Sequence, residues 1–255
     1  EYFQEVEDKL TEETDYKLEI SQSMKVIMDC EKIDNLLFPH YYPEYSSDKI
    51  ITMDWMNGIH LSEFCSSNAS QEQRDKVGQT LWNFYMYQIH QLKKFHADPH
   101  PGNFLVDKND NLIAIDFGCM KEIPNDFYVP YFEVSTPESL KDMDYFTKKL
   151  FELEILKTTD SPKELAFFTD MFHELLSVFT QPIQSEVFDF AQPEFQAQIA
   201  ALSEKFASDK TLRKMNGNRG SKHFIYVNRT FFGLYSLMFD IKAKVKINDF
   251  EKYLN

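Results

Sequence analysis

The stretch His96-Ala97-Asp98-Pro99-His100-Pro101-Gly102-Asn103 is followed, thirteen positions after its Asn, by Asp116-Phe117-Gly118. Pro99 and Pro101 each remove a backbone donor and fix φ, so a preceding helix must end before them and the chain must continue as an extended loop. Such a loop is rigid enough to hold a carboxylate in place. The stretch therefore predicts a functional loop built around Asp98.

The residues between these two motifs predict a β-hairpin. Phe104-Leu105-Val106 and Leu112-Ile113-Ala114-Ile115 are short apolar runs, and 107–111 between them is rich in turn-forming residues. The open ends of two antiparallel strands are adjacent, so Asn103 and Asp116 would lie together and could share a cation. The hairpin explains the thirteen-residue spacing.

These three side chains match the needs of phosphoryl transfer. That reaction is catalysed mainly by positioning and charge neutralisation, and it uses a carboxylate at the acceptor hydroxyl and oxygen ligands for magnesium on the nucleotide phosphates. Asp98 would serve the acceptor, and Asn103 and Asp116 would bind Mg²⁺. ATP and Mg²⁺ are the cofactors that this arrangement indicates.

The remaining patterns are mostly helical. Apolar residues recur at helical spacing from Gln71 to Phe95, with a capping box formed by Ser70 and Gln73. One strand is predicted from Lys49 to Met56. Further helices are predicted over 138–157, 162–180, 190–207 and 221–244, with Pro137 and Pro162 near helix starts. Residues 1–30 read as an acidic helix whose apolar positions are Val6, Leu10, Leu18 and Met24.

The chain resembles the UbiB/ADCK (AarF-like) family of atypical kinases, whose catalytic loop has the form His-x-Asp-Pro-His-Pro-Gly-Asn. Glu13-Thr14-Asp15-Tyr16 resembles the family's Glu-x-Asp motif, and Glu19 falls where the family places the helix glutamate that pairs with the nucleotide-binding lysine. Lys49–Gly58 resembles the last small-lobe strand and the hinge that contacts adenine. Asn228–Leu234 resembles part of the C-terminal helices.

The resemblance implies an α+β, mostly helical fold, with a partial small lobe over 1–57 and a kinase-like large lobe over 58–255. The family's Lys-x-Gly-Gln segment and lysine-bearing strand do not precede Glu13, so we expect the chain to be a fragment. Asp54, Trp55 and Met56 would contact adenine through the backbone. By the same resemblance, Glu13 and Asp15 would guard the acceptor site.

The function implied is an ATP-dependent phosphotransferase or ATPase in isoprenoid quinone or other lipid metabolism, acting on a small molecule or lipid rather than on a protein. A second hypothesis is a pseudokinase-like module that binds a nucleotide, lipid or partner without turnover. A third, a choline- or aminoglycoside-type kinase, shares the Asp98-to-Asn103 spacing but does not predict His100 or the Glu13 motif.

The charge, cysteine content and hydropathy of the chain exclude several classes of partner and location. Lys plus Arg is 27 and Asp plus Glu is 41, a net charge of −14, without basic runs, which argues against nucleic acid and anionic membrane surfaces. Cys30, Cys65 and Cys119 are far apart and form no disulfide or zinc pattern, which favours a reducing compartment. The sequence has no apolar run that would span a bilayer. We expect a cytoplasmic location, and the resemblance adds peripheral association with the inner membrane face.

Each candidate residue has an ordinary structural alternative. His96 and His100 have the spacing of a helical zinc site, but Pro99 excludes the helix, and in the kinase interpretation they orient the loop. Asp98 alone could be a turn residue before proline. Glu13 and Asp15 could belong to a solvated acidic surface. Arg229, on an apolar helix, is interpreted as a snorkelling or internally paired cation.

Overall fold

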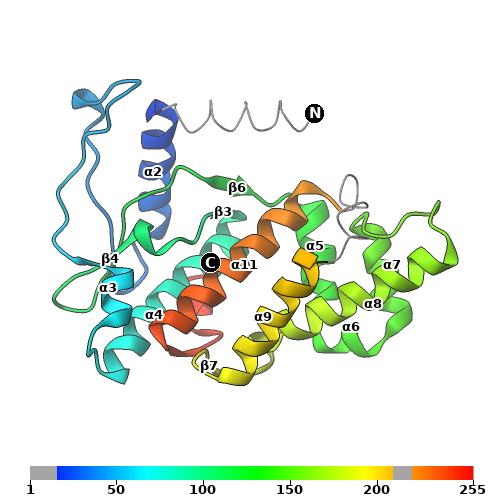
Figure 1. Cartoon of the computed structure of the whole chain (residues 1–255). Coiled ribbons are helices and arrows are strands. Elements are labelled where there is room, and N and C mark those ends of the chain that lie inside the picture. The colour runs from blue at the N-terminus through cyan, green and yellow to red at the C-terminus, as the bar shows by residue number, and fades with distance from the viewer. Residues whose placement is uncertain (1–15, 209–219, 255) are drawn as a thin grey trace.

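The computed structural model describes residues 16–208 and 220–254 of the chain. This part is α+β and mostly helical, as predicted. Helix α2 (Tyr16–Cys30) and a small sheet lie at one end, and a body of helices extends away from them (Figure 1). Residues 96–103, which we call the catalytic loop after the family motif that they resemble, lie between these two parts, so both parts contribute to the surroundings of this loop.

The small sheet contains the predicted hairpin. Its strand order is β1 (Leu36–Leu37), β5 (Leu112–Ala114), β4 (Phe104–Val106) and β2 (Ile59–His60). Strands β4 and β5 are antiparallel, with Phe104 opposite Ala114 and Val106 opposite Leu112. The Asp107 carboxylate accepts hydrogen bonds from the backbone N–H groups of Asn109 and Asn111, which fixes the connecting turn. The hairpin prediction is confirmed.

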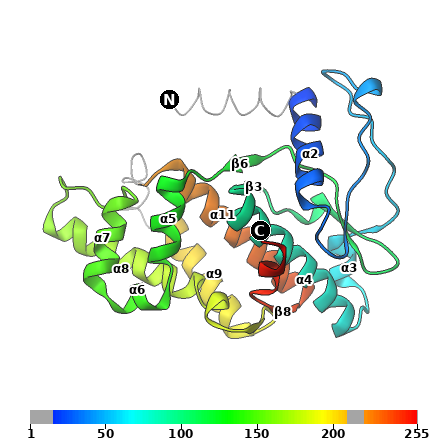
Figure 2. The same cartoon turned by 180° about the vertical axis from the view of Figure 1, so that it is seen from behind.

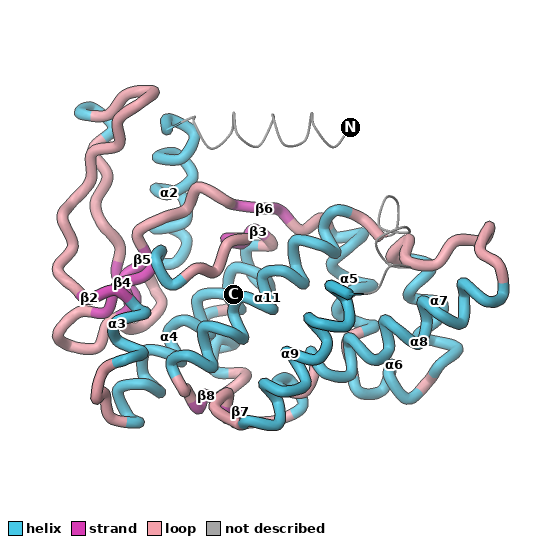
Figure 3. Tube along the Cα trace, viewed as in Figure 1, coloured by secondary structure: helices cyan, strands magenta, loops and turns pink. Residues whose placement is uncertain are grey.

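The predicted strand from Lys49 to Met56 is wrong. Residues 38–58 form a long loop that projects from the sheet beside α2 (Figures 1 and 3), with a 3₁₀ turn, η1, at Pro43–Tyr45. The chain reverses between Ser47 and Ile50, where each backbone N–H donates to the other carbonyl, and a second isolated bridge joins Tyr41 to Met53. The apolar run is therefore interrupted by a turn, and no ladder forms along it.

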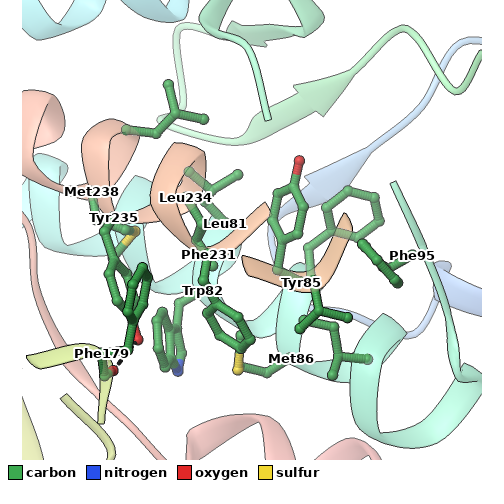
Figure 4. Packing of buried hydrophobic residues seen from close by; sticks show 14 of the residues in the cluster. Leu81, Trp82, Tyr85, Met86, Phe95, Phe179, Phe231, Leu234, Tyr235 and Met238 are labelled. Carbon is green, nitrogen blue, oxygen red and sulfur yellow. Dashed lines mark hydrogen bonds between the residues drawn. The ribbon is translucent and has the colours of Figure 1, made fainter. Parts of the chain in front are cut away.

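Helix α4 (Gln71–Tyr87) runs through the centre of the helical body. It begins with the predicted capping box: the Ser70 hydroxyl accepts from the Gln73 backbone N–H, and the Gln73 side chain accepts from the Ser70 N–H. Helix α11 (Lys222–Ile241) lies beside it (Figures 1 and 2). Aromatic and aliphatic side chains of the two helices interdigitate in the core, with Trp82 nearly parallel to Tyr235 (Figure 4).

The helix predicted over Gln71–Phe95 ends earlier than expected. After Tyr87 the chain makes a π-helical turn, η2 (Gln88–Leu92). This helical segment ends at Lys93, whose φ of 51° lies in the left-handed region. Phe95 belongs instead to strand β3 (Lys94–His96), which pairs with β6 (Met120–Glu122), so that His96 lies opposite Met120. This ribbon sets the entry and exit of the catalytic-loop region.

Three of the other predicted helices are confirmed within a few residues: α8 (Pro162–Phe179), α9 (Pro193–Ser208) and α11. The helix expected over 138–157 is two helices, because Asp142 ends the first and its carboxylate caps the second by accepting from the Tyr145 N–H. The remaining elements are α3 (Leu61–Ser66), η3 (Pro101–Asn103), α5 (Asn125–Val134), α6 (Pro137–Lys141), α7 (Met143–Glu152), η4 (Pro182–Gln184), β7 (Val187–Asp189), β8 (Lys244–Lys246) and η5 (Asp249–Tyr253).

The apolar face predicted for the first helix is wrong over the part of that helix that the structure describes, α2. Leu18 and Met24 are 38 % and 44 % exposed, and the side of α2 that packs inward carries Ile20, Val26 and Cys30. Val6 and Leu10 lie outside the described residues. Within residues 16–208 and 220–254, the helices are too short or too polar to cross a membrane.

Candidate active site

Four of the predicted catalytic and cofactor-binding residues line one cavity of about 340 Å³, which we call the carboxylate cavity. They are Glu19 from α2, Asp98 and Asn103 from the catalytic loop, and Asp116 from the segment after β5. His96 also reaches this cavity, from the end of β3. The structure thus brings together carboxylates that are up to 97 residues apart in the sequence.

The hairpin places Asn103 beside Asp116. The backbone N–H of Ile115 donates to the carbonyl of Asn103 over 3.0 Å, one step beyond the last paired residues of β4 and β5. The Asn103 amide nitrogen donates to the Asp98 carbonyl at 3.0 Å, which ties the two ends of the loop together and leaves the amide oxygen of Asn103 available. One oxygen of Asp116 accepts from the Gly118 N–H at 2.9 Å.

The two histidines have different environments. His96 is buried; its backbone N–H donates to the Gln88 side chain, and its Nδ1 lies 3.4 Å from the Tyr85 hydroxyl. Burial lowers the pKa of His96, against the opposing effect of the charges on Asp116 and Asp98. His100 is exposed, and its Nδ1 accepts from the Gly102 N–H at 3.1 Å. His100 therefore braces the loop locally.

The electrostatics of the cavity favour a cation. Burial, followed by the nearby negative charge of Asp116, raises the pKa of Glu19. Burial also raises the pKa of Tyr41 to about 12, with Glu19 and Asp116 adding to the effect; its hydroxyl donates to the Ile115 carbonyl. A positive ion between Glu19 and Asp116 would relieve this repulsion.

The donor set fits magnesium. Mg²⁺ prefers oxygen ligands and is usually held by one or two carboxylates together with substrate phosphates and water. Asp116 and the amide oxygen of Asn103 supply such ligands. Across 16–208 and 220–254, no group of three or more His, Cys, Asp or Glu side chains has the arrangement to hold a metal ion by itself.

The predicted adenine-contacting residues lie in the projecting loop. The Asp54 carboxylate accepts from the Tyr42 hydroxyl at 2.9 Å and from the His40 N–H at 3.3 Å, and the Trp55 side chain is 90 % exposed. Asp54, Trp55 and Met56 are not among the residues that line the carboxylate cavity, although Ile51 of the same loop is. Glu13 and Asp15 lie outside the described residues.

Two contacts join the catalytic loop to α11. Arg229 donates to the Asp98 carboxylate at 3.2 Å, as expected for an internally paired cation. One turn further, Gly233 lies so close to the loop that a Cβ there would stand 2.4 Å from Pro99 Cγ. The second contact could not be predicted, because nothing local in the sequence relates Gly233 to a loop 134 residues earlier.

The sequence model of the ABC1 atypical kinase-like domain matches residues 1–149, more than half of the chain. The chain belongs to the ABC1 atypical kinase-like family. This agrees with the UbiB/ADCK resemblance, and it identifies the cavity as lying in the region that ABC1 family members share. The match also shows that the domain of this chain is kinase-like.

Similar ABC1 proteins come from plants and fungi. The chain is 28 % identical over 165 residues to Protein ACTIVITY OF BC1 COMPLEX KINASE 7, chloroplastic, of Arabidopsis thaliana, covering 63 % of this chain and 24 % of that protein. It is 30 % identical over 105 residues to Atypical kinase COQ8, mitochondrial, of Saccharomyces cerevisiae, covering 41 % and 21 % respectively. The chain thus spans about a quarter of the length of these curated relatives.

A solved structure has the same fold. The complex of Rv3197 with erythromycin from Mycobacterium tuberculosis superposes with a TM-score of 0.71, at 22 % identity, over 97 % of this chain and 60 % of that one. The described residues therefore adopt an arrangement known from a solved structure, and the predicted kinase-like fold class is confirmed.

Proposed function

We propose that this chain binds a magnesium–nucleotide complex and acts as an ATP-dependent phosphotransferase or ATPase. The observation that supports this best is the shared cavity, in which Asn103 and Asp116 are held side by side by the hairpin and Asp98 is tied to Asn103 through its carbonyl. A carboxylate, an amide oxygen and a second carboxylate in this order suit magnesium-assisted phosphoryl transfer.

In this proposal each residue has one task. Magnesium, when bound, would neutralise the phosphate oxygens of the nucleotide. Asn103 and Asp116 would hold it through their side-chain oxygens. The Asp98 carboxylate would accept a hydrogen bond from the attacking hydroxyl or water, orient it and take up its proton. Glu19 would bind a cation beside Asp116, whether magnesium or a lysine ammonium.

The family resemblance supplies the proposed context. It favours isoprenoid quinone or other lipid metabolism and a small-molecule or lipid acceptor, with Glu13 and Asp15 restricting access of protein substrates. Adenine would be bound by the backbone of Asp54, Trp55 and Met56. A cytoplasmic chain that associates peripherally with the inner membrane face would meet such acceptors; the two relatives named above are chloroplastic and mitochondrial by name.

One observation favours the second hypothesis, a nucleotide-binding module without turnover. Burial and then the charge of Asp116 raise the pKa of Glu19, so these two carboxylates repel each other across the cavity. If no lysine relieved this repulsion, the site would bind its nucleotide through magnesium alone and would position the phosphates poorly for transfer.

The first test is thermal unfolding of the chain with and without saturating magnesium and ATP, beside Asp116→Ala. Ligand at about a hundred times its dissociation constant adds roughly 2.7 kcal/mol of stability. We expect a magnesium-dependent rise in the melting temperature that Asp116→Ala abolishes. An equal shift in parent and variant would refute the metal assignment, and no shift in the parent would refute nucleotide binding by this chain.

A second measurement separates the enzyme from the module. Asp98→Asn should leave nucleotide affinity within a few-fold and abolish ADP release. If the parent binds ATP and releases no ADP under single-turnover conditions, the module hypothesis replaces the enzyme.

A further inference from the structure

A second cavity, of about 490 Å³, is lined by residues of α9 and α11 together with Asp98 and Pro99 of the catalytic loop. Apolar side chains form most of its wall: Phe190, Phe195, Ile199, Phe232, Tyr235 and Phe239. The Tyr235 hydroxyl is already donated to the Phe179 carbonyl at 2.7 Å, so this residue offers the cavity its ring and not its hydroxyl. The volume falls in the range of small-molecule sites, roughly 300–1,000 Å³.

This apolar cavity meets the carboxylate cavity at one side chain. Asp98 lines both of them, and Pro99 and Arg229 join it on the apolar side. One carboxylate oxygen of Asp98 is engaged by Arg229 at 3.2 Å, and the second oxygen has no hydrogen-bond partner among the described residues. A group bound in the apolar cavity would therefore find a free carboxylate oxygen at its polar end.

The side chains that line this apolar cavity indicate which class of ligand it would bind. Aromatic and aliphatic side chains gain by covering an apolar body, roughly 25 cal/mol for each Å² removed from water. The polar end presents a hydrogen-bond acceptor, Asp98, beside the cation Arg229, in a chain whose net charge is −14. A hydroxyl group can donate to the free oxygen of Asp98, and because it is neutral it adds no charge beside the ion pair of Asp98 and Arg229.

We propose that this cavity binds the apolar body of an alcohol and presents its hydroxyl to Asp98, so that it is the acceptor site of the phosphoryl transfer proposed above. This inference rests on that proposed function. In the transfer, the alcohol oxygen forms a bond to the γ-phosphorus and the bond from that phosphorus to the bridging oxygen breaks. ADP leaves with the bonding electrons, and the hydroxyl proton passes to Asp98.

The test uses 2-naphthylmethanol, an aromatic primary alcohol, titrated into the chain by calorimetry. Ala200 of α9 lines the cavity, whereas its neighbour Ala201 does not and is exposed. Ala200→Trp should fill the cavity and weaken binding at least tenfold, and Ala201→Trp should bind as the parent does. Ser236→Phe fills the same cavity from α11 and serves if Ala200→Trp fails to fold.

The hydroxyl has its own control. 2-Methylnaphthalene lacks it and should bind roughly tenfold more weakly, the value of one hydrogen bond to a charged acceptor. That difference should disappear in Asp98→Ala. Equal binding of 2-naphthylmethanol to the parent and both cavity-filled variants would overturn the proposal, as would an absence of binding to the parent or equal affinity of the two probes.

The outcome is independent of the nucleotide measurement. The magnesium- and ATP-dependent stabilisation of the parent reports the proposed function, and Ala200→Trp should retain it because Ala200 is not among the residues lining the carboxylate cavity. Probe binding without nucleotide stabilisation would refute the proposed function and leave an alcohol site. Nucleotide stabilisation without probe binding would refute the acceptor site alone.

Discussion

Gly233→Ala tests whether α11 sets the position of the catalytic loop. A Cβ at residue 233 would lie 2.4 Å from Pro99 Cγ, 3.3 Å from Pro99 Cδ and 3.2 Å from the Pro99 carbonyl oxygen. The pyrrolidine ring cannot rotate away, because its φ is fixed by the ring itself. The added methyl therefore displaces either the helix or the loop that carries Asp98.

Two opposing terms set the size of the effect. Alanine is better than glycine in a helix interior by up to about 1 kcal/mol, whereas inserting a methyl into a closely packed site costs typically about 1–3 kcal/mol. We therefore expect a net loss of about 1 kcal/mol in the free energy of unfolding. Because the strain falls next to Asp98, turnover should decrease more than nucleotide affinity.

A double-mutant cycle measured by urea unfolding isolates the contact. Pro99→Ala removes the ring carbons that clash, so Gly233→Ala in that background should be neutral or stabilising. Ser236→Ala, an exposed position on the same helix, controls for helix propensity. If Gly233→Ala stabilises the parent and the Pro99→Ala variant equally, then α11 does not pack against the loop as argued.

Further predictions concern titration and capping. Burial lowers the pKa of His90 from 6.5 to about 4. As the pH falls, the unfolded chain therefore takes up a proton before the folded chain does, and the free energy of unfolding should decrease by about 3 kcal/mol between pH 7 and 4. Urea unfolding of His90→Phe, measured over the same pH range, should lack this part of the pH dependence. Because burial and Asp116 raise the pKa of Glu19, Glu19→Gln should stabilise the unliganded chain at pH 7, and the gain should vanish as the pH approaches 4.5; a gain that does not depend on pH would contradict this assignment. Ser70→Ala should cost about 1 kcal/mol of unfolding free energy, which Ser70→Asp should largely restore.

The elements that the sequence predicted well are those fixed by neighbouring residues. The capping box of Ser70 and Gln73 and the turn of Asp107–Asn111 depend on side chains that bond to backbone two to four residues away. The closeness of Asn103 to Asp116 follows from that turn, because the two open ends of a hairpin are always adjacent.

The errors arise where distant packing decides. Leu18 and Met24 have helical spacing, yet the face of α2 that is buried is set by the surfaces that α2 meets. The helix from Gln71 stops before Phe95 because β3 pairs with β6, a ribbon whose second strand comes 24 residues later. The apolar cavity beside Asp98 requires α9 and α11 together, and no local pattern in either helix indicates it.

The ion pair of Arg229 with Asp98 joins a locally predicted loop to a helix that only the distant packing brings beside it. Both side chains are about half exposed or more, at 64 % and 49 %, so the pair contributes at most about 1 kcal/mol and can be replaced at little cost. The second oxygen of Asp98 is left open for an acceptor hydroxyl, and in the proposed transfer Arg229 would orient the Asp98 carboxylate through the first oxygen. Arg229→Gln should then affect the rate of transfer more than the stability of the fold. A loss of stability well above 1 kcal/mol would instead make Arg229 a structural cation.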